Sequence, residues 1–114
     1  QHKINMEDKM KIICVADSAH AWGVISAEQL ATARMTENDI SSFSYCTPDR
    51  QTYALEEDVD LTKYLNKLDS MGIKYELIDR YIPNQQSKDN PRTWEHIHIE
   101  DKRLTKRQEA ELGY

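Results

Sequence analysis

The sequence predicts an α+β fold of the ferredoxin-like class, in which the order βαββαβ forms a four-stranded antiparallel sheet with two helices on one face. Three observations support this fold. Residues 11–17 are apolar on both faces, as in a strand at the centre of a sheet. Residues 41–57 contain two alternating stretches joined by Thr-Pro-Asp-Arg, which is a hairpin pattern. Helical periodicity follows the first strand and the hairpin, at residues 26–35 and 61–71.

The first helix is predicted to begin at Ser26, which can cap it, and Gln29 three residues later completes a capping box. Leu30 and Ala33 form its inward stripe. Between the first strand and this helix, we expect Ala16–Ser26 to form a loop at the carboxyl end of the strand.

The hairpin is expected to have one packed and one solvated face, because its apolar and polar residues alternate. Phe43 and Tyr45 share one face of its first strand. Asp58 or Asp60 is predicted to cap the second helix, and Gly72 to end it. The apolar stripe of that helix consists of Leu61, Tyr64, Leu65 and Leu68.

The fourth strand, at residues 73–82, is predicted to face the core with Ile73, Tyr75, Leu77 and Tyr81. The expected sheet order is fourth, first, third, second, which makes the strand at 41–46 an edge that a second copy of the chain could pair with in a homodimer. Cys14 and Cys46 then lie on non-adjacent strands and cannot form a disulfide.

The domain organisation is predicted to be a leader or tag remnant at residues 1–10, a core domain at 11–82 and an extension at 83–114 that packs on the same domain. Within the extension we expect a polar loop at 83–91, a short strand within 93–101 and a helix at 105–114.

Composition and charge narrow the functional class. The chain has 114 residues, of which 39% are hydrophobic and 31% charged, as in one soluble domain. No apolar stretch approaches a membrane span, and two cysteines are too few for a disulfide scaffold, so a cytoplasmic location is expected. The net charge is −5, and residues 37–60 carry seven acids and one base. This charge argues against binding to nucleic acid and is compatible with a partner that has a basic surface.

The loop Ala16–Ser26 contains three residue types of a hydrolytic triad, Asp17, Ser18 and His20. Triad side chains converge from separate parts of a fold, so three within four residues do not predict one. Two interpretations of the loop remain. Either His20 and Trp22 are recognition groups, or Trp22 closes the edge of the core and His20 bonds to backbone.

Two further clusters are candidates for chemistry. His96 and His98 alternate on the predicted fifth strand and are weak metal-ligand candidates, with His20 or Asp17 as a third ligand. A surface strand without metal is the favoured interpretation, and no cofactor is expected. Glu56, Glu57 and Asp58 crowd the step from strand to helix, where the helix dipole favours acids.

Three stretches, "ICVADSAHAWGVIS", "ISSFSY" and "YALEEDVDL", occur in this order. They resemble a group of small uncharacterised phage- and plasmid-encoded proteins, and the likeness covers residues 12–81. The resemblance implies an origin in a mobile element, a location in the host cytoplasm and a role in binding and blocking a host protein. It supplies no catalytic residues.

The sequence therefore favours a small acidic interaction protein that binds and modulates or inhibits a host or defence protein. Its expected contact residues are His20, Trp22, Glu56, Glu57 and Asp58. The alternative is a small metal-dependent nuclease or phosphoesterase on a ferredoxin-like sheet, with Asp17 at the end of the first strand as its metal-binding carboxylate.

Overall fold

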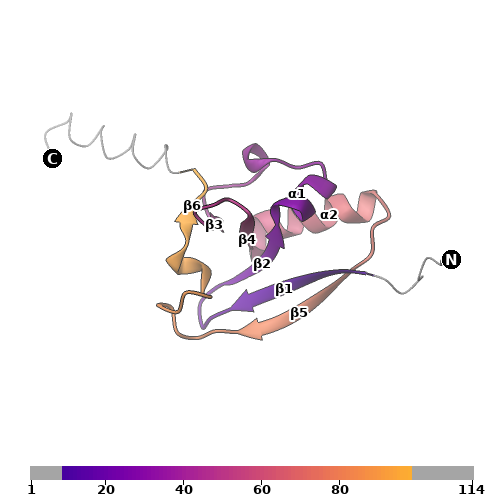
Figure 1. Ribbon diagram of the computed structural model, residues 1–114. Coiled ribbons are helices and arrows are strands. Elements are labelled where there is room, and N and C mark those ends of the chain that lie inside the picture. Colours follow the sequence, from indigo (N-terminus) through magenta and orange to yellow (C-terminus); the bar gives the residue numbers. More distant parts are fainter. Residues whose placement is uncertain (1–8, 99–114) are drawn as a thin grey trace, which may run out of the picture.

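The computed structural model describes residues 9–98, which form a six-stranded mixed sheet and two α-helices (Figure 1). The strands are β1 (Met10–Ala16), β2 (Ala21–Ser26), β3 (Tyr45–Cys46), β4 (Thr52–Glu56), β5 (Tyr75–Tyr81) and β6 (Glu95–His96). The helical elements are α1 (Ala27–Thr32), the 3-10 turn η1 (Glu37–Asp39), the π-helical turn η2 (Glu57–Leu61), α2 (Thr62–Ser70) and the 3-10 turn η3 (Pro91–Thr93). The sheet order is β5-β1-β2-β4-β3-β6. The α+β class is confirmed, whereas the predicted four-stranded antiparallel sheet is wrong because the sheet is larger and mixed.

The difference begins at Ala16–Ser26, which was predicted to be a loop and instead contains β2. The Asp17 amide donates to the His20 carbonyl (2.9 Å), and the Asp17 carboxylate accepts from the amides of Ala19 (2.9 Å) and His20 (2.8 Å). These bonds close a tight turn, so the next residues pair with β1 in an antiparallel hairpin. The additional strand reverses the chain once more, and β5 pairs with β1 in parallel.

The interior position predicted for the first strand is confirmed, because β1 lies between β5 and β2. The hairpin of β3 and β4 is also confirmed. Its first strand is shorter than the predicted 41–46, and it is not an edge, because β3 pairs with β6 on its other side. Among the described residues, the borders of the sheet are β5 and β6.

The capping box of α1 is confirmed: Ser26 Oγ accepts from the Gln29 amide, and Gln29 Oε1 accepts from the Ser26 amide. The predicted caps of the second helix are wrong. Glu56 is the N-cap of η2, and its Oε1 accepts from the amides of Asp58 (3.0 Å) and Val59 (3.1 Å). Asp60 is instead buried.

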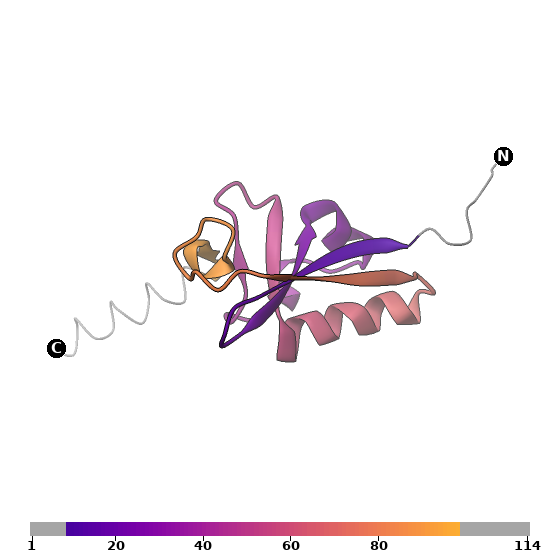
Figure 2. The same ribbon diagram turned by 90° about the horizontal axis from the view of Figure 1, so that it is seen from below.

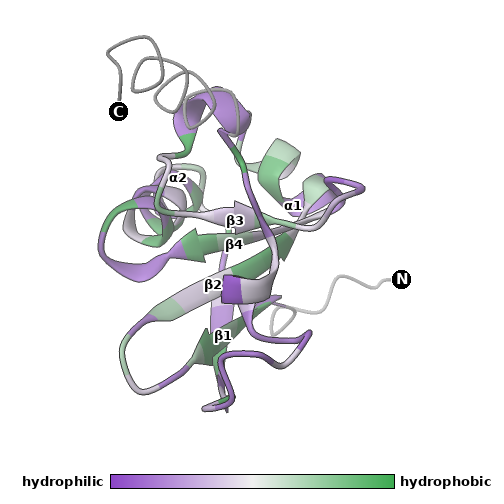
Figure 3. Ribbon diagram, turned by 90° about the vertical axis from the view of Figure 1, so that its left-hand side faces the viewer, coloured by the Kyte–Doolittle hydropathy of each residue, from purple (hydrophilic) through white to green (hydrophobic). Residues whose placement is uncertain are grey.

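One core joins the helices to one face of the sheet. Directly opposed residues of neighbouring strands share a face, and this face carries Ile12, Ile25, Tyr53 and Leu55. The helices add Leu30, Ala33, Leu61, Tyr64 and Leu68, as their periodicity predicted, with Leu65 partly buried. Figure 2 shows α2 along one side of the sheet, and Figure 3 shows apolar residues along β1 and β4.

Two contacts fix the packing of the helical elements, one between α2 and α1 and the other between η2 and β2. The Tyr64 hydroxyl donates to the Gln29 carbonyl (2.9 Å) and so joins α2 to α1, and burial raises the pKa of Tyr64 to about 12. Gly23 lies against Leu61, where an added Cβ would be 2.4 Å from Leu61 Cδ1. The absence of a side chain at position 23 therefore lets η2 pack directly on β2. Gly72, at φ +71°, ends α2 as predicted.

The prediction for β5 is half right. Ile73 and Tyr75 pack against the core. Leu77 and Tyr81, predicted to be core residues, are 44% and 64% exposed because β5 is a border of the sheet.

The remaining predictions concern the ends of the chain. The loop at 83–91 is confirmed up to Pro91, where η3 begins, and the fifth predicted strand is the two-residue β6. The strand β1 begins at Met10, inside the predicted leader; residues 1–8 and the predicted helix at 105–114 lie outside the described residues. Cys14 and Cys46 are free thiols on β1 and β3, which are not neighbours, as predicted. Over residues 9–98, no helix combines the length and the apolarity of a membrane span.

Candidate functional site

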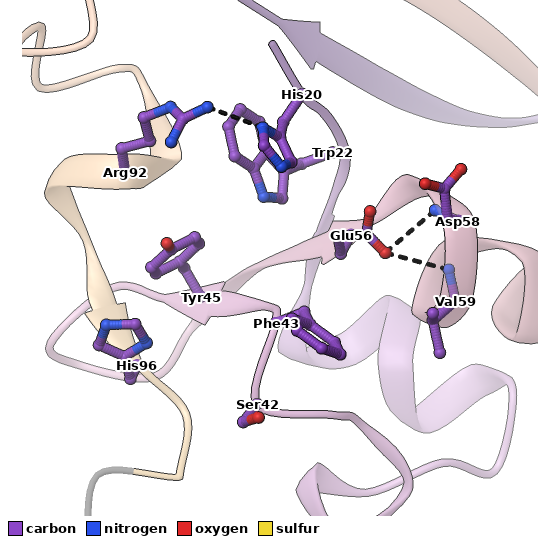
Figure 4. Close-up of a pocket in the computed structure, with 10 residues that line it drawn as sticks. All are labelled: His20, Trp22, Ser42, Phe43, Tyr45, Glu56, Asp58, Val59, Arg92 and His96. Carbon is purple, nitrogen blue, oxygen red and sulfur yellow. Dashed lines mark hydrogen bonds between the residues drawn. The ribbon is translucent and has the colours of Figure 1, made fainter. Parts of the chain in front are cut away.

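An open pocket of about 520 Å³ lies on the sheet face opposite the helices (Figure 4). Its strand residues are Trp22, Tyr45, Glu56 and His96, which the pairing of β2, β4, β3 and β6 brings to one face. The turns at the ends of these strands add His20, Ser42, Phe43, Asp58, Val59 and Arg92.

The ion pair between Asp17 and Arg92 holds residues 90–96 over this face. The Asp17 side chain is fully buried, and its Oδ2 accepts from Arg92 Nε (2.7 Å) and Asn90 Nδ2 (3.3 Å). Its Oδ1 accepts the two turn amides of Ala19 and His20. The Arg92 hydrogen bond, helped by these amides, lowers the pKa of Asp17 far below its ordinary value. Asp17 is therefore a structural anion at the centre of a network.

Aromatic and cationic groups stack in a row from this network into the pocket. Arg92 Cζ lies 5.5 Å from the ring centroid of Trp22, which is cation–π geometry, and Arg92 also contacts His20 Nδ1 (2.8 Å). His20 stacks on Trp22 (6.1 Å between centroids), and Tyr45 meets Trp22 edge-on (6.2 Å). The ring of His96 lies next in this row, with its centroid 4.9 Å from the ring centroid of Tyr45. These contacts give the pocket a preformed aromatic wall.

A second buried carboxylate shapes the opposite wall. Asp60 is 1% exposed, and it accepts from the Ser41 amide (3.0 Å), the Ser41 hydroxyl (2.6 Å) and the Ser44 hydroxyl. Ser44 Oγ in turn accepts from the Glu56 amide (2.9 Å). These bonds fold residues 41–44 into a turn, so Phe43 does not continue the strand with Tyr45 as predicted. Phe43 is held outward at the pocket, 65% exposed.

The charges of the pocket are separated. Figure 4 shows the Arg92 guanidinium on one side of the pocket and the Glu56 and Asp58 carboxylates on the other. Phe43 and Val59, which is 48% exposed, supply apolar surface at the acidic side. The pocket can therefore contact a side chain that has both an apolar stem and a positive charge.

The structure brings together four of the five predicted contact residues. His20, Trp22, Glu56 and Asp58 line the pocket, whereas Glu57 is exposed and is not one of its lining residues. Trp22 is 2% exposed, so it closes the pocket wall and is not itself an exposed recognition group.

The two histidines of the predicted metal pair diverge. His96 faces Tyr45 in the pocket, whereas His98 lies in the turn after β6 and its Nε2 contacts the Ile40 carbonyl. Among residues 9–98, no group of three or more His, Cys, Asp or Glu side chains is arranged to hold a metal ion.

Four important residues of the site were not predicted to belong to it: Phe43, Tyr45, Asp60 and Arg92. The alternation of Phe43 and Tyr45 was a visible signal, but it indicated strand packing. The residues around Arg92 in the sequence do not indicate its role in the site, because its partner Asp17 lies 75 residues earlier in the chain.

No protein-family model, curated protein or solved structure matches this chain.

Proposed function

We propose that this chain is a non-enzymatic interaction protein that binds a host or defence protein and modulates or inhibits it. The proposed binding site is the pocket, which takes up a basic side chain of the partner. One observation carries the proposal. Phe43 is held in an exposed position beside Asp58 and Val59 by the hydrogen bonds that the buried Asp60 carboxylate accepts from Ser41 and Ser44.

The arrangement fits the way protein interfaces gain affinity. A small number of aromatic anchors in preformed pockets contribute most of the binding free energy, and surrounding charges govern partner choice and association rate. Here Phe43 is the exposed anchor and the stacked wall at Tyr45 is preformed. The acids Glu56 and Asp58 favour a partner segment with lysine or arginine.

The alternative, a metal-dependent nuclease using Asp17, receives no support from the geometry of that residue. A carboxylate offers about four acceptor positions, and those of Asp17 are taken by Ala19, His20, Asn90 and Arg92. A metal ion at Asp17 would have to displace Arg92, which would uncover Trp22.

The test is affinity capture from bacterial lysate, followed by calorimetric titration of the captured partner. Phe43→Ala should weaken binding by about 2 kcal/mol or more, roughly thirtyfold. Met71→Ala, which removes an exposed apolar side chain elsewhere, is the matched control and should bind as the wild type does.

The charge of the pocket is tested with Asp58→Lys, with Glu57→Lys as the neighbouring control outside the pocket lining. Asp58→Lys should weaken binding more than Glu57→Lys does. If Phe43→Ala and Asp58→Lys both retain wild-type affinity, the pocket is not the binding site and the proposal fails.

A further inference from the structure

The strand β5 presents a long free border. In Figure 1 it forms the lower edge of the sheet, and of the described residues only β1 pairs with it. Leu77 and Tyr81 on this strand are 44% and 64% exposed. Exposed apolar residues on an unpaired edge favour pairing with another strand.

The backbone of β5 shows which of its groups are available. The Lys74 carbonyl accepts from the Met10 amide (2.9 Å), and the Ile82 amide donates to the Ala16 carbonyl (2.7 Å). Alternate residues of a strand direct their N–H and C=O to the same side. The even-numbered residues of β5 therefore bond to β1. The odd-numbered residues, Tyr75, Leu77, Asp79 and Tyr81, direct both backbone groups outward.

An antiparallel pair of two β5 strands has one well-matched register, with the twofold axis at Ile78. It places Tyr75 opposite Tyr81 and Leu77 opposite Asp79, and all four residues have outward backbone groups, as hydrogen-bonded pairs require. It also places Glu76 opposite Arg80 twice, in non-hydrogen-bonded pairs, where side chains approach most closely.

The neighbouring antiparallel registers place residues of like charge opposite each other. An axis at Leu77 sets Lys74 opposite Arg80, and an axis at Asp79 sets the two Asp79 carboxylates opposite each other. An axis at Glu76 brings the two Glu76 side chains together. Like charges in directly opposed positions are destabilising.

We propose that this chain forms a homodimer in which two β5 strands pair antiparallel about Ile78 and join the two sheets into one. The partner strand is a second copy because β5 is complementary to itself in both hydrogen-bonding pattern and charge. Pairing also shields Leu77 and Tyr81 from water. The interface is separate from the pocket and does not depend on the proposed function.

The proposed pairing of Arg80 with Glu76 of the second copy competes with one ion pair that Arg80 makes within its own chain. Arg80 Nη2 lies 3.6 Å from Asp89 Oδ2, with side chains 59% and 51% exposed. An ion pair this exposed contributes little free energy, so Arg80 can turn toward Glu76 of the second copy.

The experiment is sedimentation velocity of the full chain over a range of concentrations. The wild type should reach twice the 13.4 kDa mass of the chain as the concentration rises. Glu76→Arg and Arg80→Glu, each alone, create two like-charged pairs and should raise the dimer dissociation constant at least about tenfold. The double variant Glu76→Arg/Arg80→Glu restores opposite charges and should restore the dimer.

Two further variants test whether dimerisation uses the outward edge of β5. Asp89→Asn removes the existing ion pair of Arg80 and should remain dimeric. Asp79→Pro removes an outward amide that β1 does not use, so it should yield a folded monomer by circular dichroism. A wild type that stays monomeric, a Glu76→Arg variant that dimerises normally, or a folded double variant that stays monomeric would each overturn the proposal.

Discussion

Replacement of Asp17 by asparagine removes a negative charge from the Arg92 network without changing the size of the side chain. The asparagine Oδ1 can still accept from the amides of Ala19 and His20. Its NH₂ group, however, would face Arg92 Nε and Asn90 Nδ2, which are both donors. The variant therefore loses the bonds from Asn90 and Arg92 that hold residues 90–96 over Trp22.

The expected cost follows from these contacts. A hydrogen bond to a charged group contributes roughly 1.5–3 kcal/mol. Arg92 is 27% exposed and can recover part of its hydration, so we expect a loss of about 2 kcal/mol. For a domain of this size the melting temperature should fall by roughly 8 °C.

The loss should also depend on pH. The folded-state pKa of Asp17 lies below its unfolded-state value, so its contribution to stability is complete above about pH 5. This contribution is lost as the pH falls through about 4 toward the folded-state pKa, because the unfolded state then binds the proton more readily. The difference in melting temperature between wild type and Asp17→Asn should therefore shrink in acid.

The measurement is thermal unfolding by circular dichroism between pH 7 and pH 3. Asp58→Asn, the same chemical change at an exposed carboxylate, is the control and should shift stability by no more than about 0.5 kcal/mol. A melting temperature of Asp17→Asn within about 2 °C of wild type at neutral pH, comparable to that control, would contradict the structural role assigned to Asp17. So would a difference that stays constant in acid.

Three other substitutions test the packing around the site. Gly23→Ala places a Cβ 2.4 Å from Leu61 Cδ1 and should lower the free energy of unfolding by about 1–3 kcal/mol, measured by urea unfolding. In a Leu61→Ala background the same substitution should cost less, because the side chain it meets is shorter. Equal costs in both backgrounds would contradict the contact. Trp22→Ala should cost about 3–5 kcal/mol in the same assay because its ring is buried, and a loss below about 1 kcal/mol would mean that Trp22 is not part of the packed structure. Asp60→Ala removes the acceptor of the Ser41 amide and should speed hydrogen exchange at that amide; unchanged exchange would show that Asp60 does not hold the turn.

Part of the candidate site could be predicted from the sequence. The sequence indicates His20 and Trp22 as members of a recognition loop and Glu56 and Asp58 as members of an acidic cluster, and these four residues line one pocket. Their convergence could not be predicted, because it depends on the pairing of β2 with β4, which sets Trp22 opposite Glu56. With Ala16–Ser26 interpreted as a loop, no such pairing was available.

The roles of the acidic residues show the same limit. Asp60 lies between a strand and a helix, where its residue type is typical of an N-cap. Asp17 has the sequence pattern of a polar residue at the end of a strand. Whether such a carboxylate is solvated or buried depends on donors far along the chain, here Ser41 and Ser44 for Asp60 and Arg92 for Asp17. A local pattern carries no information about such partners.

The features that could be predicted correctly from the amino-acid order are local: the capping box at Ser26, the Thr47–Arg50 turn of the hairpin, the apolar stripe of α2 and its end at Gly72. Each of these depends on residues within a few positions of one another, whose geometry follows from backbone propensities and periodicity. The number of strands, the parallel pairing of β5 with β1 and the borders of the sheet emerge only in the folded chain. They do so because a strand satisfies its backbone hydrogen bonds through a neighbour at any sequence distance, so an apolar strand pattern specifies burial without specifying the partner.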